Sequence, residues 1–189
     1  MNTVRRALFA IAAVAIAFPA PAQMGGYDGA QFVKAIQDGN SNDAVKLLQS
    51  QPTLINARDL NGQTALIAAI NNRDHDWTGY LLQQGADPNM AGPNGETPLI
   101  AAARAGFGDA VDWLVQLGAR VNDSNRAGET ALIIAVQRRQ VPIVRTLLNS
   151  GADPDKTDSV AGYSARDYAK RDNRTPEMLK LIEAKKPAP

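Results

Sequence analysis

Residues 95–103 have the sequence GETPLIAAA, and related sequences occur on both sides of this stretch. They are GQTALIAAI at 62–70, GETALIIAV at 128–136 and, in a weaker form, GYSARDYAK at 162–170. A second series has GADPN at 85–89, GARVN at 118–122 and GADPD at 151–155, with successive members 33 residues apart. Because two interleaved series share one period, we predict that the chain is built from repeated structural units.

Each unit carries the signals of a helix that is closed by a tight turn. Three threonines precede the apolar runs, and their hydroxyls can cap the helices that follow: Thr64, Thr97 and Thr130. Pro98 suits a first helical position because its missing N–H would be unpaired there in any case. We expect Gly106 to end its helix in the left-handed conformation, and Arg73 and Arg139, at the equivalent positions, to share that positive φ.

A second helix and an extended finger complete the predicted unit. The second helices should begin near Asp76, Asp109 and Pro142, with each aspartate as the capping residue. Tight turns are expected at three dipeptides in the fingers: Asn61-Gly62, Asn94-Gly95 and Ala127-Gly128. Strand structure should be limited to short pairings within these fingers.

This arrangement resembles the ankyrin repeat family, whose motif G-x-T-P-L-H-x-A-A is matched most closely by residues 95–103. Isoleucine replaces the usual histidine of the motif, so the hydrogen-bond network built on that histidine must be absent; the three replacements, which we expect to pack in the core, are Ile67, Ile100 and Ile133. The resemblance implies an all-α fold, an ankyrin repeat solenoid of five stacked helix-turn-helix units. Three repeats are clear, and divergent, more polar capping units are expected at both ends. The units should span about 27–60, 61–93, 94–126, 127–160 and 161–184, with ten helices in five antiparallel pairs.

The first 22 residues have the pattern of a secretory signal peptide. Arg5 and Arg6 precede an apolar run from Ala7 to Phe18, which is too short to cross a membrane, and Ala20 and Ala22 fit a cleavage site. We therefore predict a signal peptide at 1–22, an ankyrin repeat domain at 23–189 that ends in a short tail at 185–189, and a periplasmic location. After cleavage we expect no insertion into the membrane.

Composition excludes several kinds of chemistry. The 189 residues include no cysteine and one histidine, which removes disulfides, thiolate sites and multi-histidine metal sites. Removal of the signal peptide changes the formal net charge from +1 to −1, which argues against a nucleic-acid partner. We expect no cofactor, no enzymatic activity and a monomer.

Two small groups of residues are candidates for chemistry. Asp74-His75-Asp76 combines two carboxylates with an imidazole and could form a metal or ligand site, but the repeat pattern places it in a turn beside a helix start. Ser164 and Asp167 lack the histidine that a hydrolytic triad requires. Three aromatic side chains on second helices are expected to pack in the core: Trp77, Tyr80 and Trp113.

In proteins of this family, binding residues lie at the finger tips and at the exposed ends of the first helices. Transferred to this sequence by position, that implies a partner-binding surface of Leu60, Asn61, Gln63, Asn71, Asn72, Pro93, Asn94, Glu96, Arg104, Arg126, Glu129, Gln137, Arg138, Tyr163 and Arg171. We expect the charged residues Arg104, Arg126, Glu129 and Arg138 to be exposed. Six leucines should be buried: Leu66, Leu99, Leu132, Leu81, Leu114 and Leu147.

The resemblance therefore predicts a module that binds another protein, whose identity the sequence does not specify. A scaffold, stabiliser or inhibitor of an envelope enzyme is the alternative, and it differs only in the consequence of binding. A metal or ligand site at Asp74-His75-Asp76 is the third hypothesis. Fold alone does not supply function, so the first two hypotheses rest on analogy with the family.

Overall fold

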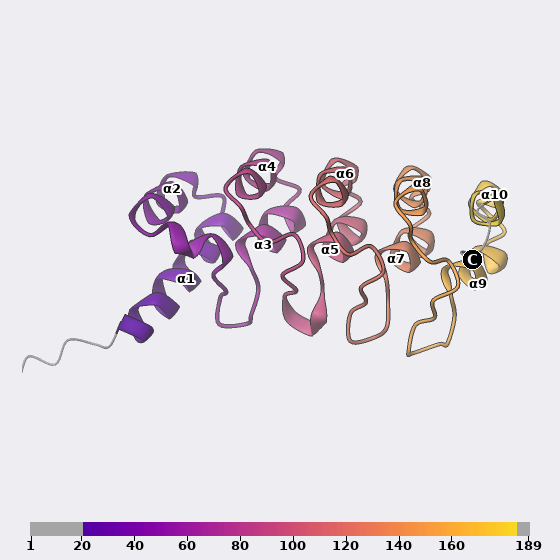
Figure 1. The fold of residues 1–189 in the computed structure, drawn as a ribbon, viewed down its shortest axis with the longest axis horizontal. Helices are drawn as coiled ribbons and strands as arrows, with labels where there is room; N and C mark the ends of the chain where they lie inside the picture. Colours follow the sequence, from indigo (N-terminus) through magenta and orange to yellow (C-terminus); the bar gives the residue numbers. More distant parts are fainter. Residues whose placement is uncertain (1–20, 185–189) are drawn as a thin grey trace, which may run out of the picture.

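The computed structural model describes residues 21–184, and within them the chain forms five helix pairs that stand side by side in a row (Figure 1). The first helix of each pair lies nearer the fingers: α1 (Pro21–Gln37), α3 (Ala65–Asn71), α5 (Pro98–Ala105), α7 (Ala131–Gln137) and α9 (Ala165–Arg171). The second, outer helix lies on the other side: α2 (Ser41–Ser50), α4 (His75–Gln83), α6 (Gly108–Gln116), α8 (Val141–Asn149) and α10 (Pro176–Ala184). Two 3₁₀ turns, η1 (Pro52–Asn56) and η2 (Pro93–Gly95), complete the described elements.

The all-α, five-unit solenoid is thus confirmed. Helix α1 begins at Pro21, so the predicted signal peptide lies outside the described residues except for Pro21 and Ala22. The tail at 185–189 also lies outside them. Pairing between extended segments in the described chain is limited to isolated bridges such as Arg58 with Thr64 and Ser124 with Thr130.

The inner helices begin as their threonines predict. The Oγ1 atoms of Thr64, Thr97 and Thr130 each accept a hydrogen bond, 3.2 Å long, from the backbone N–H three residues later. The donors are the three isoleucines that replace the motif histidine, and these isoleucine side chains are buried. In the last repeat Ser164 and Asp167 form a reciprocal capping box, which is a structural role and no part of a catalytic group.

The turn after each inner helix also agrees with prediction, but the next helix starts differently. Gly106 has φ 67°, and Arg73 and Arg139 have φ 53° and 57°. The predicted caps at Asp76 and Asp109 are wrong. Asp74 caps α4 by accepting from the Trp77 N–H at 2.9 Å, because the residue after the left-handed turn returns to an extended conformation. Helix α6 begins after Phe107 with no side-chain cap, and Asp109 lies exposed in its first turn.

One apolar core runs through all five repeats. The six predicted leucines are buried, none more than 2% exposed. Alanines on the inner helices, such as Ala69, Ala102 and Ala135, are also buried, and their small side chains let neighbouring inner helices pack closely. Each repeat therefore needs its neighbours to cover its apolar surface.

The fingers are joined to one another by backbone hydrogen bonds. The Arg126 N–H donates to the Asn94 carbonyl, and the Ser159 N–H donates to the Ala127 carbonyl, each over 2.8 Å. At the base of the fingers, Asn89 accepts from the Arg120 N–H and donates to the Gly118 carbonyl of the next repeat. The fingers consequently form one continuous edge of the molecule.

Candidate protein-binding surface

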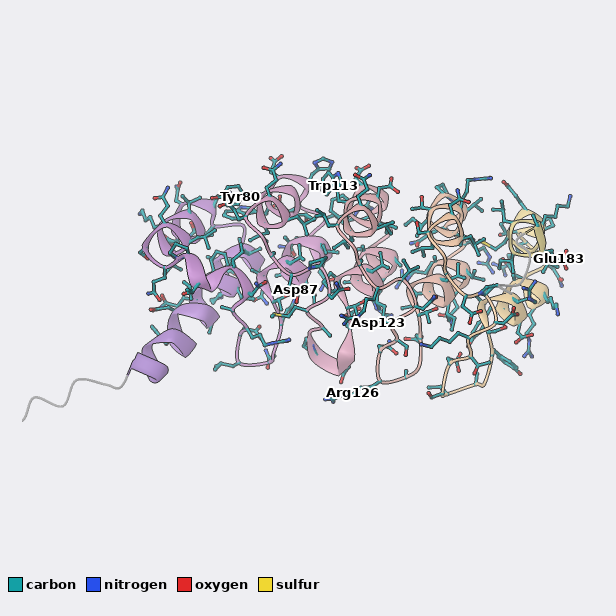
Figure 2. All side chains as sticks on the ribbon, in the orientation of Figure 1. Tyr80, Asp87, Trp113, Asp123, Arg126 and Glu183 are labelled. Carbon is teal, nitrogen blue, oxygen red and sulfur yellow. The ribbon has the colours of Figure 1, made fainter. Side chains whose placement is uncertain are left out.

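The predicted binding residues lie along the edge made by the fingers and the adjoining ends of the inner helices. Nine of the predicted residues are exposed: Leu60, Asn61, Asn71, Asn72, Asn94, Arg126, Gln137, Arg138 and Arg171. The other six are half-buried: Gln63, Pro93, Glu96, Arg104, Glu129 and Tyr163. Figure 2 shows Arg126 at a finger tip, on the side of the molecule away from the outer helices. Leu60, at another tip, is 94% exposed.

The centre of this surface is a depression between the finger that turns at Asn94-Gly95 and the next finger, which turns at Ala127-Gly128; its volume is about 560 Å³. Its lining consists of Pro93, Asn94, Glu96, Arg104, Asn125, Arg126, Ala127 and Glu129. The structure therefore brings six of the predicted residues together, from two adjacent fingers and helix α5. Asn125 and Ala127 were not predicted as site residues, although Asn125 lies one repeat period before Asp158 and two after Asp59.

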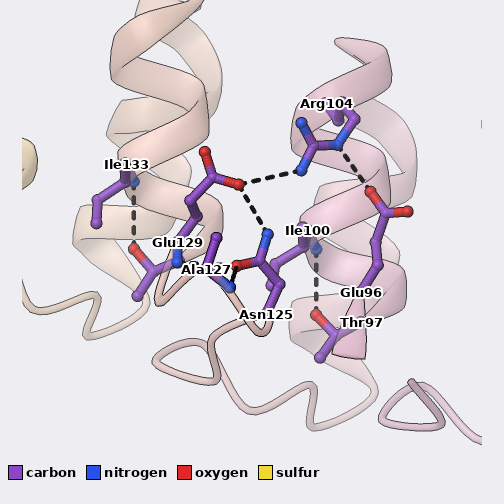
Figure 3. A network of polar contacts seen from close by, with 9 residues as sticks. Glu96, Thr97, Ile100, Arg104, Asn125, Ala127, Glu129 and Ile133 are labelled. Atoms are coloured by element: carbon purple, nitrogen blue, oxygen red, sulfur yellow. Dashed lines mark hydrogen bonds and ion pairs between the residues drawn. The ribbon is translucent and has the colours of Figure 1, made fainter. Parts of the chain in front are cut away.

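An ion-pair network occupies the floor of this depression (Figure 3). Arg104 Nε lies 2.8 Å from Glu96 Oε1, and its guanidinium lies 3.5 Å from Glu129 Oε2. Asn125 holds the second glutamate, because its amide donates to Glu129 Oε2 over 2.8 Å. Burial lowers the pKa of Arg104, but the hydrogen bonds and charges of Glu96 and Glu129 outweigh that effect and raise it.

The expected exposure of Arg104 and Glu129 is therefore wrong. Their side chains are 39% and 24% exposed, because each lies between two fingers and pairs with a residue of the neighbouring repeat or its own finger. Arg126 and Arg138 are exposed as predicted. Within residues 21–184 neither of these two arginines forms an ion pair, so they present free positive charge.

The last repeat has a second polar cluster. The guanidinium of Arg171 lies 4.3 Å from the centre of the Tyr163 ring, which packs edge to face on Tyr168. The Tyr168 hydroxyl donates to Asp158 Oδ2 over 2.6 Å, and Asp158 is buried. Burial raises the pKa of Asp158, but this hydrogen bond and three backbone N–H donors outweigh it and hold the pKa below its usual value. Tyr163 thus both packs and remains half-exposed.

A depression of about 430 Å³ adjoins this cluster, between α7 and α9. It includes the predicted residues Gln137 and Arg171, together with Arg139. Arg139 Nε lies 2.9 Å from Asp172 Oδ2, and that hydrogen bond lowers the pKa of Asp172. Sequence reasoning missed this pair, although the two residues are separated by one repeat period.

At the other end of the array, Asn72 has a structural role. Its amide donates to the carbonyls of Ile36 and Gln37 and so satisfies the end of helix α1. Gln63 lies within weak hydrogen-bond distance of Gln37, at 3.5 Å. These two members of the predicted surface therefore help join the first two repeats.

Asp74, His75 and Asp76 do not converge. Asp74 caps helix α4, and His75 Nε2 lies 3.3 Å from Asp109 on the next outer helix. No group of three potential metal-ligating side chains occurs in the described part of the chain. The His75 ring also packs against Trp113, with ring centres 4.6 Å apart.

The prediction for the aromatic residues is correct only for Trp77. Trp77 is buried, and its indole N–H donates to Ser41 Oγ over 2.9 Å. Tyr80 is exposed and contacts the edge of the Trp77 ring, and Trp113 is half-buried between outer helices. Helical spacing turns these two side chains toward the solvent side of α4 and α6, whereas the leucines that follow them face the core.

Comparison with known families agrees with this geometry. A family model described as ankyrin repeats (3 copies) matches residues 32–125 and 78–158. A search of curated proteins finds no match. Between residues 21 and 184, none of the helices has the length and apolar character that crossing a membrane requires. The family match covers most of the chain with the repeat period seen in the sequence and in the helix pairs, and on this evidence the chain belongs to the ankyrin repeat family.

Proposed function

We propose that this protein is a non-catalytic periplasmic module that binds another protein through its fingers and inner helices. Ankyrin repeats generally mediate protein–protein interaction, which supports the class of function. The observation that carries the proposal is the central depression, which side chains from two adjacent fingers and helix α5 line together. A scaffold, stabiliser or inhibitor of an envelope enzyme would use the same surface with a different consequence.

The charges suggest what the partner presents. The charge of Arg104 is more than neutralised by Glu96 and Glu129 within the protein, whereas Arg126 and Arg138 are exposed and free of ion pairs in the described chain. A partner that places carboxylates over these two arginines would gain complementary charge. Exposed amides, such as Asn94 and Gln137, can supply hydrogen bonds around them.

The test is capture of partners from an envelope extract by the purified mature protein. Arg126→Ala with Arg138→Ala should reduce capture strongly, and more so at low salt, where exposed charges act over longer distances. A matched control removes two exposed cations from outer helices, Lys46→Ala with Lys180→Ala. Capture that is unchanged by the finger variant but lost in the outer-helix control would contradict the assignment of the surface.

The location has its own test. If the signal peptide is cleaved after Ala22, protein released by osmotic shock should begin at Gln23 on N-terminal sequencing. Intact protein with Met1, found in the cytoplasm, would refute the periplasmic location without affecting the binding surface.

A further inference from the structure

A second candidate surface lies among the outer helices, on the side away from the fingers. It is a groove of about 300 Å³. Its lining consists of Gly79, Leu82 and Gln83 of α4, Trp113 and Gln116 of α6, and Leu117, which follows α6 directly. Most of its lining is apolar. Figure 2 shows Trp113 on this side of the molecule and Arg126 on the opposite side.

The groove exists because two residues depart from the pattern of the other repeats. Gly79 takes the position that Asp112 and Arg145 have in the next two repeats. With no side chain there, the Trp113 ring lies over α4, its Cη2 atom 3.8 Å from the place that a Cβ of residue 79 would occupy. Leu117 stands where the neighbouring repeats have Gln84 and Ser150, and it is 53% exposed.

Apart from His75, which lies 3.3 Å from Asp109, the ionisable side chains of the two helices that line this groove are acidic or tyrosine. Helices α4 and α6 contain three exposed aspartates and neither lysine nor arginine: Asp76, Asp109 and Asp112. The remaining outer helices each carry a cation, Lys46, Arg145 or Lys180. The cations nearest to these helices in sequence lie outside them: Arg73 and Arg120 are in turns, and Arg104 is on α5, where it pairs with Glu96 and Glu129. Arg120 pairs with Asp123 at 2.7 Å.

On both helices the aspartates lie nearer the N-terminal end than the residues that line the groove. On α6, Asp109 and Asp112 precede Trp113 and Gln116 on the exposed face, and on α4 Asp76 precedes Gly79 and Gln83 in the same way. An apolar floor thus adjoins an acidic end. Such a lining matches a ligand that has an apolar side chain close to positive charge, since each part finds its complement.

We propose that this groove binds a basic peptide segment, with an aliphatic side chain inserted between Leu82, Trp113 and Leu117. Lysine or arginine residues of the segment pair with Asp112 and with Asp109, whose carboxylate also faces His75, and the amides of Gln83 and Gln116 bond its backbone. The fingers take no part in this contact, so the proposal does not rest on the proposed function. It gives the protein two faces for two different ligands.

The two tryptophans allow a direct test by NMR on the mature protein. A short synthetic peptide of leucine and lysine should shift the indole N–H signal of Trp113, identified from Trp113→Phe. The signal of Trp77, which is buried and bonded to Ser41, should stay unchanged. A peptide in which glutamate replaces lysine should bind far more weakly, because it meets the aspartates with like charge.

Two variants restore the residues of the neighbouring repeats and so should keep the fold. Gly79→Arg fills the groove and should remove the Trp113 shift, and Leu117→Gln should weaken peptide binding about tenfold by removing apolar contact. Arg126→Ala with Arg138→Ala is the control on the other face and should bind the peptide normally. A cooperative melting curve with no loss in melting temperature shows that each variant is folded, and Gly79→Arg should melt at an equal or higher temperature through helix propensity.

Three outcomes would overturn the proposal. The lysine peptide fails to shift the Trp113 signal, or the glutamate peptide binds as well as the lysine peptide, or Gly79→Arg binds the peptide as the parent protein does. Light scattering measures the oligomeric state. If the parent protein is a dimer and Leu117→Gln is a monomer, a second copy of the chain occupies the groove and the proposal is also wrong.

Discussion

Arg104 joins two neighbouring fingers through ion pairs with Glu96 and Glu129. Because its side chain is 39% exposed, solvent screens these pairs, and they are worth less than fully buried ones. The residue therefore belongs to the architecture of the binding surface as much as to its recognition. Arg126, at the edge of the same depression, makes no ion pair within the described residues.

We predict that Arg104→Ala lowers the free energy of unfolding by about 1 kcal/mol, since two carboxylates lose their partner. Arg126→Ala should change it by less than about 0.5 kcal/mol. Urea denaturation measures both effects. In a double-mutant cycle, Arg104→Ala and Glu129→Gln should be non-additive because the side chains interact. Additive effects would show that Arg104 and Glu129 do not interact in solution.

Asp158 gives the last repeat a dependence on pH. Its pKa in the folded protein is below the unfolded value of about 4, so its contribution to stability is complete above that value and is lost as the pH falls through the folded pKa. Asp158→Asn should therefore lower stability at pH 7 by about 1–3 kcal/mol and have a smaller effect near pH 3. Urea denaturation at the two pH values measures this difference, and an equal loss at both would contradict it.

At the scale of the element, the fingers that turn at Gly95 and Gly128 each contact the next finger through that tight turn. Gly128 has φ 76°, and a Cβ at this position would lie 2.6 Å from the backbone nitrogen of Ser159. Gly79, in contrast, is in the middle of helix α4, where a Cβ would make only ordinary contact with Trp113. We therefore expect replacement of these two glycines by alanine to change the free energy of unfolding in opposite directions.

We predict that Gly128→Ala lowers the free energy of unfolding by more than about 1 kcal/mol, because of its left-handed backbone and the contact with Ser159. Gly79→Ala should raise it by up to about 1 kcal/mol through helix propensity. Thermal unfolding of the two variants gives the comparison. Equal effects in the same direction would mean that the finger contact is not maintained in solution.

At the scale of the whole molecule, the stacked repeats share one core. The position of a core residue along the array therefore determines how many repeats its substitution destabilises. Leu99→Ala, in the third repeat, should cost about 2–5 kcal/mol and weaken protection throughout the array. Met178→Ala, in the last outer helix of the described chain, should mainly loosen α9 and α10, because within residues 21–184 they pack on one neighbouring repeat rather than two. Hydrogen exchange along the chain distinguishes the two patterns, and uniform loosening by Met178→Ala would contradict this view of the stack.

The architecture could be predicted from sequence because its causes are local and recur. Thr97 caps a helix with atoms three residues away, Gly106 ends it through its own backbone freedom, and Leu99 repeats the apolar position of Leu66 and Leu132. The family resemblance added which faces of the unit we expect to bind. Six of the residues that it named line one depression, because a regular stack converts a period in sequence into a row in space.

Residues close together in sequence therefore predict the period, the helix pairs, the caps of the inner helices and the core. Packing in three dimensions determines which polar side chains form ion pairs or hydrogen bonds with a distant residue. The pairs are Arg104 with Glu129, Arg139 with Asp172 and Tyr168 with Asp158. Packing also determines that Gly79 and Leu117 open a groove between outer helices. The reason is physical: local backbone preferences act within one repeat, whereas burial and pairing depend on the distance between side chains of different repeats or of a finger and a helix, which only packing establishes.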